Sequence, residues 1–412
     1  MLDSAFSKLR INTQRLIDRI HALGQIGALA GGGVCRLALS AEDKAGRDLV
    51  ISWMRELGLT VRIDGIGNVI GLRAGLNDSA PVMTGSHIDT VRTGGLYDGN
   101  LGVLTGLEVV QVLNDANLQT KRPLAVAFFT NEEGARFAPD MMGSLVYVGG
   151  MKLEQALATQ GIDGSTVESN LIQIGYRGQA TDKKPNVHAF VELHVEQGPV
   201  LEQEGISIGA VNSVQGISWT EFTVQGVSNH AGTTPMHLRH DAGFIAAACV
   251  QFLRMLNGQI EGQLATVGSL KLFPDLVNVI PNKAVFTVDL RNTDNTRLKQ
   301  AEQRLHSFIR EMAAQEGVSV EYRSLARFDP VSFDPAMVER IENNARQLGH
   351  SVKRMPSGAG HDAQMLARIC PTAMIFTPSV GGISHNVKEY TAPEHIEAGA
   401  NVLLTTLLQL AQ

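Results

Sequence analysis

The chain has 412 residues, enough for two domains, because single hydrophobic cores stop growing below this size. Hydrophobic residues make up 44% of it and charged residues 18%, the ordinary balance of a soluble globular protein. The formal net charge of −6, with no cluster of Lys and Arg, argues against nucleic-acid binding. No stretch approaches the roughly 20 apolar residues of a membrane span, so no membrane partner is expected.

The cysteines and the first residues indicate a cytoplasmic protein. Cys35, Cys249 and Cys370 are far apart and none forms a CxxC pair, so neither a disulfide framework nor a thiolate metal site is expected. Residues 1–4 contain no basic segment that leads into an apolar stretch, so no signal peptide is predicted.

The first half of the chain alternates helices with short apolar strands. Apolar residues at helical spacing predict a helix over residues 4–23. Ser40 and Asp43 form an approximate capping box for a second helix, which Gly58 is placed to end. The elements expected next are strands at 60–64, 68–74 and 81–86, a helix at 102–113, and strands at 123–130 and 187–193. This alternation predicts an α/β domain with a mostly parallel sheet.

The pattern changes at about residue 211 and returns after about residue 330. The changed segment predicts strands at 217–226, 264–273, 284–291 and 318–322 and helices at 241–256 and 296–315. The elements expected after it are a helix at 335–348, a strand at 373–377 and a helix from Pro393. We therefore expect an α/β domain formed by residues 1–210 and 328–412, interrupted by a smaller α+β sandwich domain at 211–327.

Polar residues follow the predicted strands, where α/β sheets bind their ligands. His87 ends one strand, and Asp89 could hold its second ring N–H. Asp98 lies in a glycine-rich loop, residues 94–102, that can approach other groups closely. A carboxylate there could bridge two metal ions, which such hydrolases hold roughly 3.5–4 Å apart. Each signal alone is weak, since a histidine at a strand end is usually an ordinary residue and an aspartate among glycines usually makes a turn.

Two adjacent glutamates and two further histidines complete a possible metal site. Adjacent positions point different ways, so Glu133 can bind metal while Glu132 acts as a general acid and base on water. His194, at another strand end, and His385, in a glycine-rich loop, would supply imidazoles. Histidine and carboxylate ligands suit Zn, Mn, Co or Ni rather than Ca.

From about Leu9 to the C-terminus, eight motifs occur in the order of a known family: GSHIDTV, GGLYDGNLGV, NEEGARF, ELHVEQG, SNHAGTTPM, PNKAVFTVDLR, SGAGHDAQ and GISHN. They resemble the hydantoinase/carbamoylase group of the M20-type metallopeptidases, which includes N-carbamoyl-L-amino-acid hydrolases, allantoate amidohydrolases and β-ureidopropionases. The resemblance implies two divalent metal ions bridged by Asp98. His87 and His194 would hold one ion, and Glu133 and His385 the other.

The resemblance also implies roles in substrate binding. His230 would polarise the scissile carbonyl and stabilise its oxyanion. Asn278 and Arg291 would hold the carboxylate of an anionic small-molecule substrate. Other substrate contacts of the family correspond to Gln197, Gly360 and His361. In the family the inserted domain is both lid and dimer interface, so a homodimer is expected, with His230 reaching the metals of the neighbouring subunit.

The implied reaction is metal-assisted hydrolysis, with Glu132 moving the proton. Related aminoacylases and dipeptidases carry a carboxylate where His194 stands, so this histidine favours an N-carbamoyl-L-amino acid as substrate. Allantoate and β-ureidopropionate remain alternatives, because the pocket beside Arg291 cannot be read from the sequence. Cleavage of a peptide or an acyl-amino acid ranks below them, as does a non-catalytic binding protein, which we would expect to lack Glu132 or a metal ligand.

Overall fold

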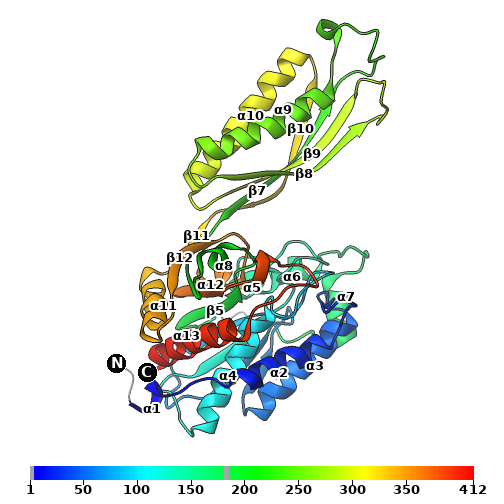
Figure 1. Ribbon diagram of the computed structural model, residues 1–412. Coiled ribbons are helices and arrows are strands. Elements are labelled where there is room, and N and C mark those ends of the chain that lie inside the picture. Colours follow the sequence, from blue (N-terminus) through cyan, green and yellow to red (C-terminus); the bar gives the residue numbers. More distant parts are fainter. Residues whose placement is uncertain (1–3, 181–184) are drawn as a thin grey trace. The chain divides into compact units, whose positions relative to one another are not determined.

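The computed structural model describes residues 4–180 and 185–412 (Figure 1). It divides into two compact units. The larger unit comprises Met1–Asn212 and Phe333–Gln412, and the inserted unit comprises Ser213–Ser332. The expected boundaries, at residues 211 and 327, lie within a few residues of these limits.

The larger unit is built on a mixed sheet with strand order β1-β2-β4-β3-β5-β13-β6-β11, in which β12 also pairs with β6. The strands are β1 Thr60–Ile63, β2 Val69–Arg73, β3 Val82–His87, β4 Leu124–Phe129, β5 Ala189–Val195, β6 Ile208–Val214, β11 Val331–Ser332, β12 Val352–Ser357 and β13 Thr372–Thr377. The four central strands, β4, β3, β5 and β13, run parallel. Strands β1, β2, β6 and β11 pair antiparallel, so the parallel arrangement expected from the sequence is found at the centre.

Helices cover this sheet on both faces (Figure 1). The central strands β3, β4, β5 and β13 are therefore buried at every position. The helices of the larger unit are α1 Ser4–Ser7, α2 Thr13–Gly24, α3 Ala41–Glu56, α4 Asn100–Asp115, α5 Met142–Tyr147, α6 Leu153–Leu157, α7 Val167–Ile174, α8 Val200–Glu204, α11 Pro335–Gln347, α12 Asp362–Leu366 and α13 Pro393–Ala411, with a 3-10 turn η2 at Val380–Gly382. Helices α4 and α13 contact the parallel strands directly.

The prediction of one helix over residues 4–23 was wrong. The chain leaves the helix after Ser7, and α2 begins at Thr13. The Asn12 side chain accepts a hydrogen bond from the Arg15 main-chain N–H at 3.0 Å and so caps the start of α2. Strands β6, β11 and β12 and the short helices α5 to α8 and α12 were not predicted, because segments this short carry little periodicity.

The inserted unit has a four-stranded antiparallel sheet of order β10-β7-β9-β8, with both long helices on one face (Figure 1). Its elements are β7 Gly216–Gln225, η1 Met236–Leu238, α9 Ala242–Gln259, β8 Leu264–Phe273, β9 Lys283–Asn292, α10 Asn295–Glu316 and β10 Ser319–Phe328. Burial alternates along β9 from one residue to the next, as expected for a sheet covered on one side. The predicted helices and strands of this segment are all present.

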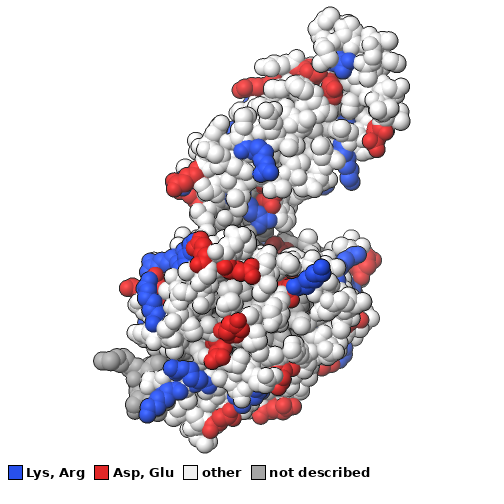
Figure 2. All heavy atoms as spheres, in the orientation of Figure 1, with Lys and Arg blue, Asp and Glu red and all other residues white. Residues whose placement is uncertain are grey.

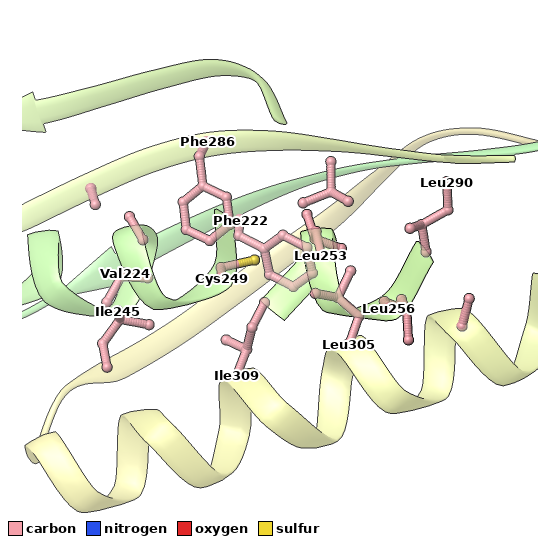
Figure 3. Close-up of a cluster of buried hydrophobic side chains, with 14 of the residues drawn as sticks. Phe222, Val224, Ile245, Cys249, Leu253, Leu256, Phe286, Leu290, Leu305 and Ile309 are labelled. Carbon is pink, nitrogen blue, oxygen red and sulfur yellow. The ribbon is translucent and has the colours of Figure 1, made fainter. Parts of the chain in front are cut away.

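Aromatic rings form the centre of the inserted unit (Figure 3). Phe222 of β7 stacks on Phe286 of β9, with ring centroids 5.4 Å apart and an interplanar angle of 19°. Cys249 of α9 and Ile309 of α10 point into the same cluster. This unit therefore has a hydrophobic core of its own. Burial of each phenylalanine in that core stabilises the unit by about 1.5–3 kcal/mol.

The surface shows no block of one charge on the face in Figure 2, where acidic and basic side chains are interspersed. Among the helices of the described residues, none combines the length and the apolar character that crossing a membrane requires.

A buried ion pair ties α3 to the loops beside the sheet. Arg47 Nε donates to Asp43 Oδ2 at 2.8 Å, and neither side chain is exposed. Arg47 Nη1 donates to the Gly67 carbonyl at 2.7 Å, and Nη2 donates to Thr130 Oγ1 at 3.2 Å. Thr130 directly follows β4, so this network supports the end of a central strand.

Arg47→Met should lower the free energy of unfolding by about 3–5 kcal/mol, because it leaves the Asp43 carboxylate buried without its partner. Lys44→Met is the matched control. It removes the exposed pair between Lys44 and Asp48 in the same helix and should cost less than about 0.5 kcal/mol. Urea unfolding followed by circular dichroism measures both. Equal effects of the two substitutions would show that the buried pair adds nothing.

Candidate metal centre

The carboxyl ends of parallel strands meet at one edge of the large sheet. His87 is the last residue of β3 and lies level with Phe129, the last residue of β4. Glu132 and Glu133 follow β4 closely, and β5, which pairs with β3, carries His194 near its end. Residues distant in sequence therefore come together where such sheets bind ligands.

Asp98 lies between imidazoles from three segments of the chain. Its Oδ1 is 3.6 Å from His87 Nε2 and 3.3 Å from His194 Nε2. Its Oδ2 is 3.3 Å from His385 Nε2. Each carboxylate oxygen thus faces a different imidazole or imidazole pair, as a carboxylate shared by two metal ions must.

The five predicted ligands form two groups that share Asp98. One group is His87, Asp98 and His194, and the other is Asp98, Glu133 and His385. Within each group the candidate ligand atoms lie within 4.8 Å of one another. His385 Nε2 is 3.3 Å from Glu133 Oε2, which closes the second group.

Main-chain carbonyls orient the two buried imidazoles. The Nδ1 atoms of His87 and His194 lie 2.9 Å from the carbonyl oxygens of Asp89 and Val195. A carbonyl only accepts, so each Nδ1 carries the proton and each Nε2 turns its lone pair toward the site.

Asp89 therefore holds the His87 ring as expected, but through its main-chain carbonyl. The Asp89 carboxylate accepts the main-chain N–H groups of Glu132 and Glu133 instead, at 3.2 and 3.3 Å. The residue thus orients a candidate ligand with one group and the paired glutamates with another. A sequence cannot distinguish these two uses of one residue.

The centre is rich in carboxylates, and in the described part of the chain none of them forms an ion pair with Lys or Arg. The fully or nearly buried ones are Asp89, Asp98, Glu132, Glu192, Asp362 and Glu389. Burial would raise the pKa of Asp98, but the imidazoles of His194, His385 and His87 beside the carboxylate hold that pKa well below its usual range. Hydrogen bonds to Asp98 and Glu133 raise the pKa of His385 to about 10. The negative field at this site therefore favours a positive charge.

The residues fit divalent metal ions. Glu133 Oε1 is buried and has no hydrogen-bond partner, although its other oxygen faces His385. The imidazole nitrogens of His87 and His194 and the shared carboxylate complete a donor set of nitrogen and oxygen atoms, which suits Zn or Mn better than Ca. Cations here would also offset the uncompensated carboxylates.

Glu132 lies at the edge of this donor set. Its Oε2 is 3.4 Å from His87 Nε2, and its side chain is almost completely buried. Burial, together with repulsion from Asp362, Glu133 and Asp89, raises the pKa of Glu132 well above its usual range, against the opposing effect of His87. A carboxylate whose pKa is raised in this way suits proton transfer near neutral pH.

Gln197 and His361 also lie at this edge of the sheet. Gln197 Nε2 donates to Asp98 Oδ2 at 3.0 Å and lies 3.4 Å from His385 Nε2.

His361 is buried against His194, with ring centroids 4.6 Å apart, and its Nε2 pairs with Ser357 Oγ at 2.9 Å. Burial and the neighbouring imidazoles lower the pKa of His361 well below its usual range, so it is neutral. Gly360 packs against Met141. Substrate contacts by these residues remain a prediction.

The inserted unit carries His230 and Asn278 on neighbouring loops. His230 Nδ1 accepts the main-chain N–H groups of Gly232 and Thr233 at 3.0 and 3.2 Å. The proton of a neutral ring is therefore on Nε2, which can donate a hydrogen bond outward. The Asn278 carbonyl accepts the Ala231 N–H at 2.9 Å, which joins the two loops.

Arg291 lies at the other end of the same sheet. The loop with Asn278 precedes Lys283, where β9 begins, and Arg291 lies eight residues further along the strand. At roughly 3.3 Å per residue, the strand from Lys283 to Arg291 spans about 26 Å. Asp289 holds the Arg291 guanidinium, accepting from Nε at 3.1 Å and from Nη2 at 2.9 Å. Within one chain, Arg291 therefore lies near the end of β9 opposite to the loop of Asn278, and the binding of a substrate carboxylate by these two residues remains a prediction.

Two buried glutamates near the ligands were missed by the sequence analysis. Glu192 accepts hydrogen bonds from Ser86 Oγ at 2.6 Å and from the Ala363 N–H at 2.8 Å. Its signal was a charged residue inside an otherwise apolar strand. Glu389 lies four residues after His385, and burial followed by repulsion from Asp98 raises the pKa of Glu389 to about 7.

Comparison with known proteins identifies the family. Residues 83–409 match peptidase family M20/M25/M40, and the chain belongs to this family of metal-dependent hydrolases. It is 40% identical over 405 residues to the N-carbamoyl-L-amino-acid amidohydrolase of Rhizobium meliloti, covering 98% of this chain and 97% of that protein. It is 34% identical to the allantoate amidohydrolase of Bacillus subtilis strain 168, covering 96% and 97%. The crystal structure of an amidase of the hydantoinase/carbamoylase family from Burkholderia multivorans matches with a TM-score of 0.94 and 44% identity over 98% of each chain.

Gly99→Ala should reduce metal binding. Gly99 has a φ of +68°, and a Cβ there would fall 2.5 Å from ring atoms of His87. Gly58→Ala is the matched control, because Gly58 has a φ of +79° but open space around it. Both substitutions introduce backbone strain of about 1–2 kcal/mol, and only the first displaces a candidate ligand. Metal content measured by mass spectrometry should fall for Gly99→Ala alone; a full metal content in that variant would refute the assignment of His87.

Proposed function

We propose that this protein is a two-metal amidohydrolase that cleaves the carbamoyl C–N bond of N-carbamoyl-L-amino acids. The observation that carries the proposal is the Asp98 carboxylate with imidazoles facing both of its oxygens. His194 stands where related aminoacylases and dipeptidases have a carboxylate, and this favours carbamoyl substrates. The relative named N-carbamoyl-L-amino-acid amidohydrolase supports the same substrate class.

In this proposal His87 and His194 hold one divalent ion, Glu133 and His385 hold the other, and Asp98 holds both. When bound, the ions would activate a water molecule by lowering its pKa from 15.7 toward roughly 7. Zn, Mn, Co and Ni all suit these ligands. Glu192 and Asp89 would keep the ligand-bearing segments in place through the hydrogen bonds described above.

Glu132 is proposed as the general base and acid. It takes a proton from the attacking water, which adds to the carbamoyl carbon, and later returns the proton to the leaving nitrogen. Its position beside His87 Nε2 and its raised pKa suit both steps. The products would be an amino acid, ammonia and carbon dioxide.

His230, Asn278 and Arg291 are proposed to bind the substrate. The Nε2–H of His230 is suited to donate to the carbamoyl oxygen as negative charge develops there. The guanidinium of Arg291 suits the substrate carboxylate. Because the loop of Asn278 precedes one end of β9 and Arg291 lies near its other end, we propose that each active site combines residues of two subunits, with the inserted unit as lid and dimer interface.

The inserted unit has surfaces that suit a homodimer. Strand β8 lies at the edge of its sheet, where main-chain groups can pair with another strand. Leu264, Leu270 and Phe273 of this strand are exposed apolar side chains. We also propose a cytoplasmic location, since none of the three cysteines forms a disulfide.

Allantoate is the second candidate substrate. It presents the same kind of carbamoyl nitrogen and a carboxylate, and a relative with 34% identity is named for it. The same metal centre would serve this reaction, so the choice depends on the groups beside Arg291. N-carbamoyl-β-alanine would test the third reaction of the group.

A substrate panel tests the proposal. The protein is stripped of metal, reconstituted with Mn, Co, Ni or Zn, and assayed for ammonia release from N-carbamoyl-L-methionine, allantoate and N-carbamoyl-β-alanine. We expect metal-dependent turnover, highest with N-carbamoyl-L-methionine. If the protein binds metal but turns over none of the three compounds, an acyl- or peptide-amide substrate is favoured instead. If the protein binds no metal, the proposal is overturned.

Glu132→Gln should lower kcat by about 10²–10⁴-fold while both ions remain bound, because it removes the base but no ligand. Glu133→Gln is the matched comparison. It replaces the adjacent carboxylate, which is a proposed ligand, and should weaken binding of one ion. Metal content and kcat of both variants distinguish the roles, and loss of metal in Glu132→Gln would contradict this assignment.

Mixing two inactive variants tests the shared active site. Glu132→Gln and His230→Ala should each be inactive as homodimers. If His230 serves the partner's site, co-expressed heterodimers contain one intact site, and random pairing restores about one quarter of wild-type activity. If His230 serves its own subunit, no combination of the two variants restores activity.

A further inference from the structure

We propose that Glu389 is a positioning residue that joins the loop carrying Asp98 to the loop carrying His385 and thereby holds the second metal site together. The inference rests on the proposed two-metal centre and concerns a residue that binds no metal itself. It follows from the hydrogen bonds of one buried carboxylate, from the packing of a glycine against it, and from the irregular loop that carries His385.

The Glu389 carboxylate accepts hydrogen bonds from both loops. Its Oε1 accepts the main-chain N–H groups of Tyr97 and Asp98, each at 3.1 Å. Its Oε2 accepts from Ser384 Oγ at 2.9 Å, directly before His385 in the chain. One rigid, planar group therefore connects the main chain of the shared ligand with the residue next to the third imidazole.

The Asp98 loop packs closely against this carboxylate. A Cβ placed on Gly95 would lie 2.1 Å from Glu389 Oε1 and 2.4 Å from Glu389 Cβ. No side chain other than that of glycine fits between them without displacing Glu389. Glu389 as a whole residue is 5% exposed, so its carboxylate oxygens depend on these donors rather than on water.

His385 needs such support more than the other imidazoles do. The side chains of His87 and His194 are 2% and 1% exposed and belong to central strands, whereas that of His385 is 50% exposed. His385 lies in a loop between η2 and α13 and has a φ of +53°. Its position relative to Asp98 is therefore not set by a regular element. The Glu389 connection supplies such a restraint, beside the hydrogen bond that Thr93 Oγ1 donates to the His385 carbonyl at 3.2 Å.

The chemistry of the connection predicts different effects for two substitutions. Glu389→Ala removes all three acceptor contacts. Glu389→Gln keeps one oxygen for the two main-chain N–H groups, and its amide can donate to Ser384 Oγ, which is able to accept. A positioning role thus predicts rescue by glutamine, since the function is geometric.

Metal titration of the apoprotein tests the proposal. Isothermal titration with Mn or Zn, and metal content after dialysis against a chelator, should give two ions per chain for the wild type. Glu389→Ala should weaken the affinity for the second ion, held by Glu133 and His385, by about 10–100-fold. The affinity for the first ion should stay nearly unchanged. Glu389→Gln should stay within a few-fold of wild type. Ser384→Ala, which removes one contact and is mild enough to fold, should weaken the second ion by a few-fold.

Asp64→Ala is the matched control. Asp64 also accepts two main-chain N–H groups, of Ile66 and Asn68, and one side-chain donor, Asn68 Nδ2. It should lower the melting temperature of the apoprotein but leave both ions bound. The proposal is overturned if Glu389→Ala and Ser384→Ala hold both ions as the wild type does, if both ions weaken equally, or if glutamine is no better than alanine. A wild type that binds no metal would instead overturn the proposed function, and this inference with it.

Discussion

The candidate metal centre depends on the position of one carboxylate. Asp98 meets two imidazoles with one oxygen and a third with the other, so both groups of ligands are built around it. Its loop can reach that position because Gly99 adopts a left-handed conformation directly against the His87 ring, where no side chain fits. The parallel strands β3 and β5 then bring His87 and His194 to the same edge, and only His385 has to arrive on a loop.

The same geometry creates an electrostatic requirement. Buried carboxylates surround Asp98, and in the described residues their partners are imidazoles, main-chain N–H groups and hydroxyls rather than Lys or Arg. Such a cluster is costly in a protein interior unless cations accompany it. Metal binding and folding of this edge are therefore expected to be linked. The hydrogen bonds to main-chain N–H groups keep the loops in place before any cation binds.

Much of this site could be predicted from the sequence, because polar residues directly after buried strands must gather at one edge of a parallel sheet. His87, Glu133 and His194 follow this rule. Contacts made by main-chain groups could not be predicted. Asp89 uses its main-chain carbonyl toward His87. Asn12 caps the start of α2 at a point where the apolar periodicity predicted an uninterrupted helix. Glu389 was missed because its two main-chain donors, Tyr97 and Asp98, are 292 and 291 residues away in sequence.

The inserted unit shows a different limit. The family resemblance suggested that Asn278 and Arg291 act on one carboxylate, but a sequence motif carries no distances. The strand bounds show that Arg291 lies near the end of β9 opposite to Lys283, and the loop of Asn278 leads into Lys283. The separation follows from strand length, and it turns a list of substrate contacts into an argument for two subunits per active site.

The most direct test of the shared-carboxylate account is the metal stoichiometry of Asp98→Ala beside that of His385→Ala. Both proteins would be titrated with Mn or Zn after removal of metal, with circular dichroism to confirm folding. The account predicts that His385→Ala retains one tightly bound ion per chain, whereas Asp98→Ala loses high affinity for both. Tight binding of one ion by Asp98→Ala would show that this carboxylate serves a single ion, and would contradict the account.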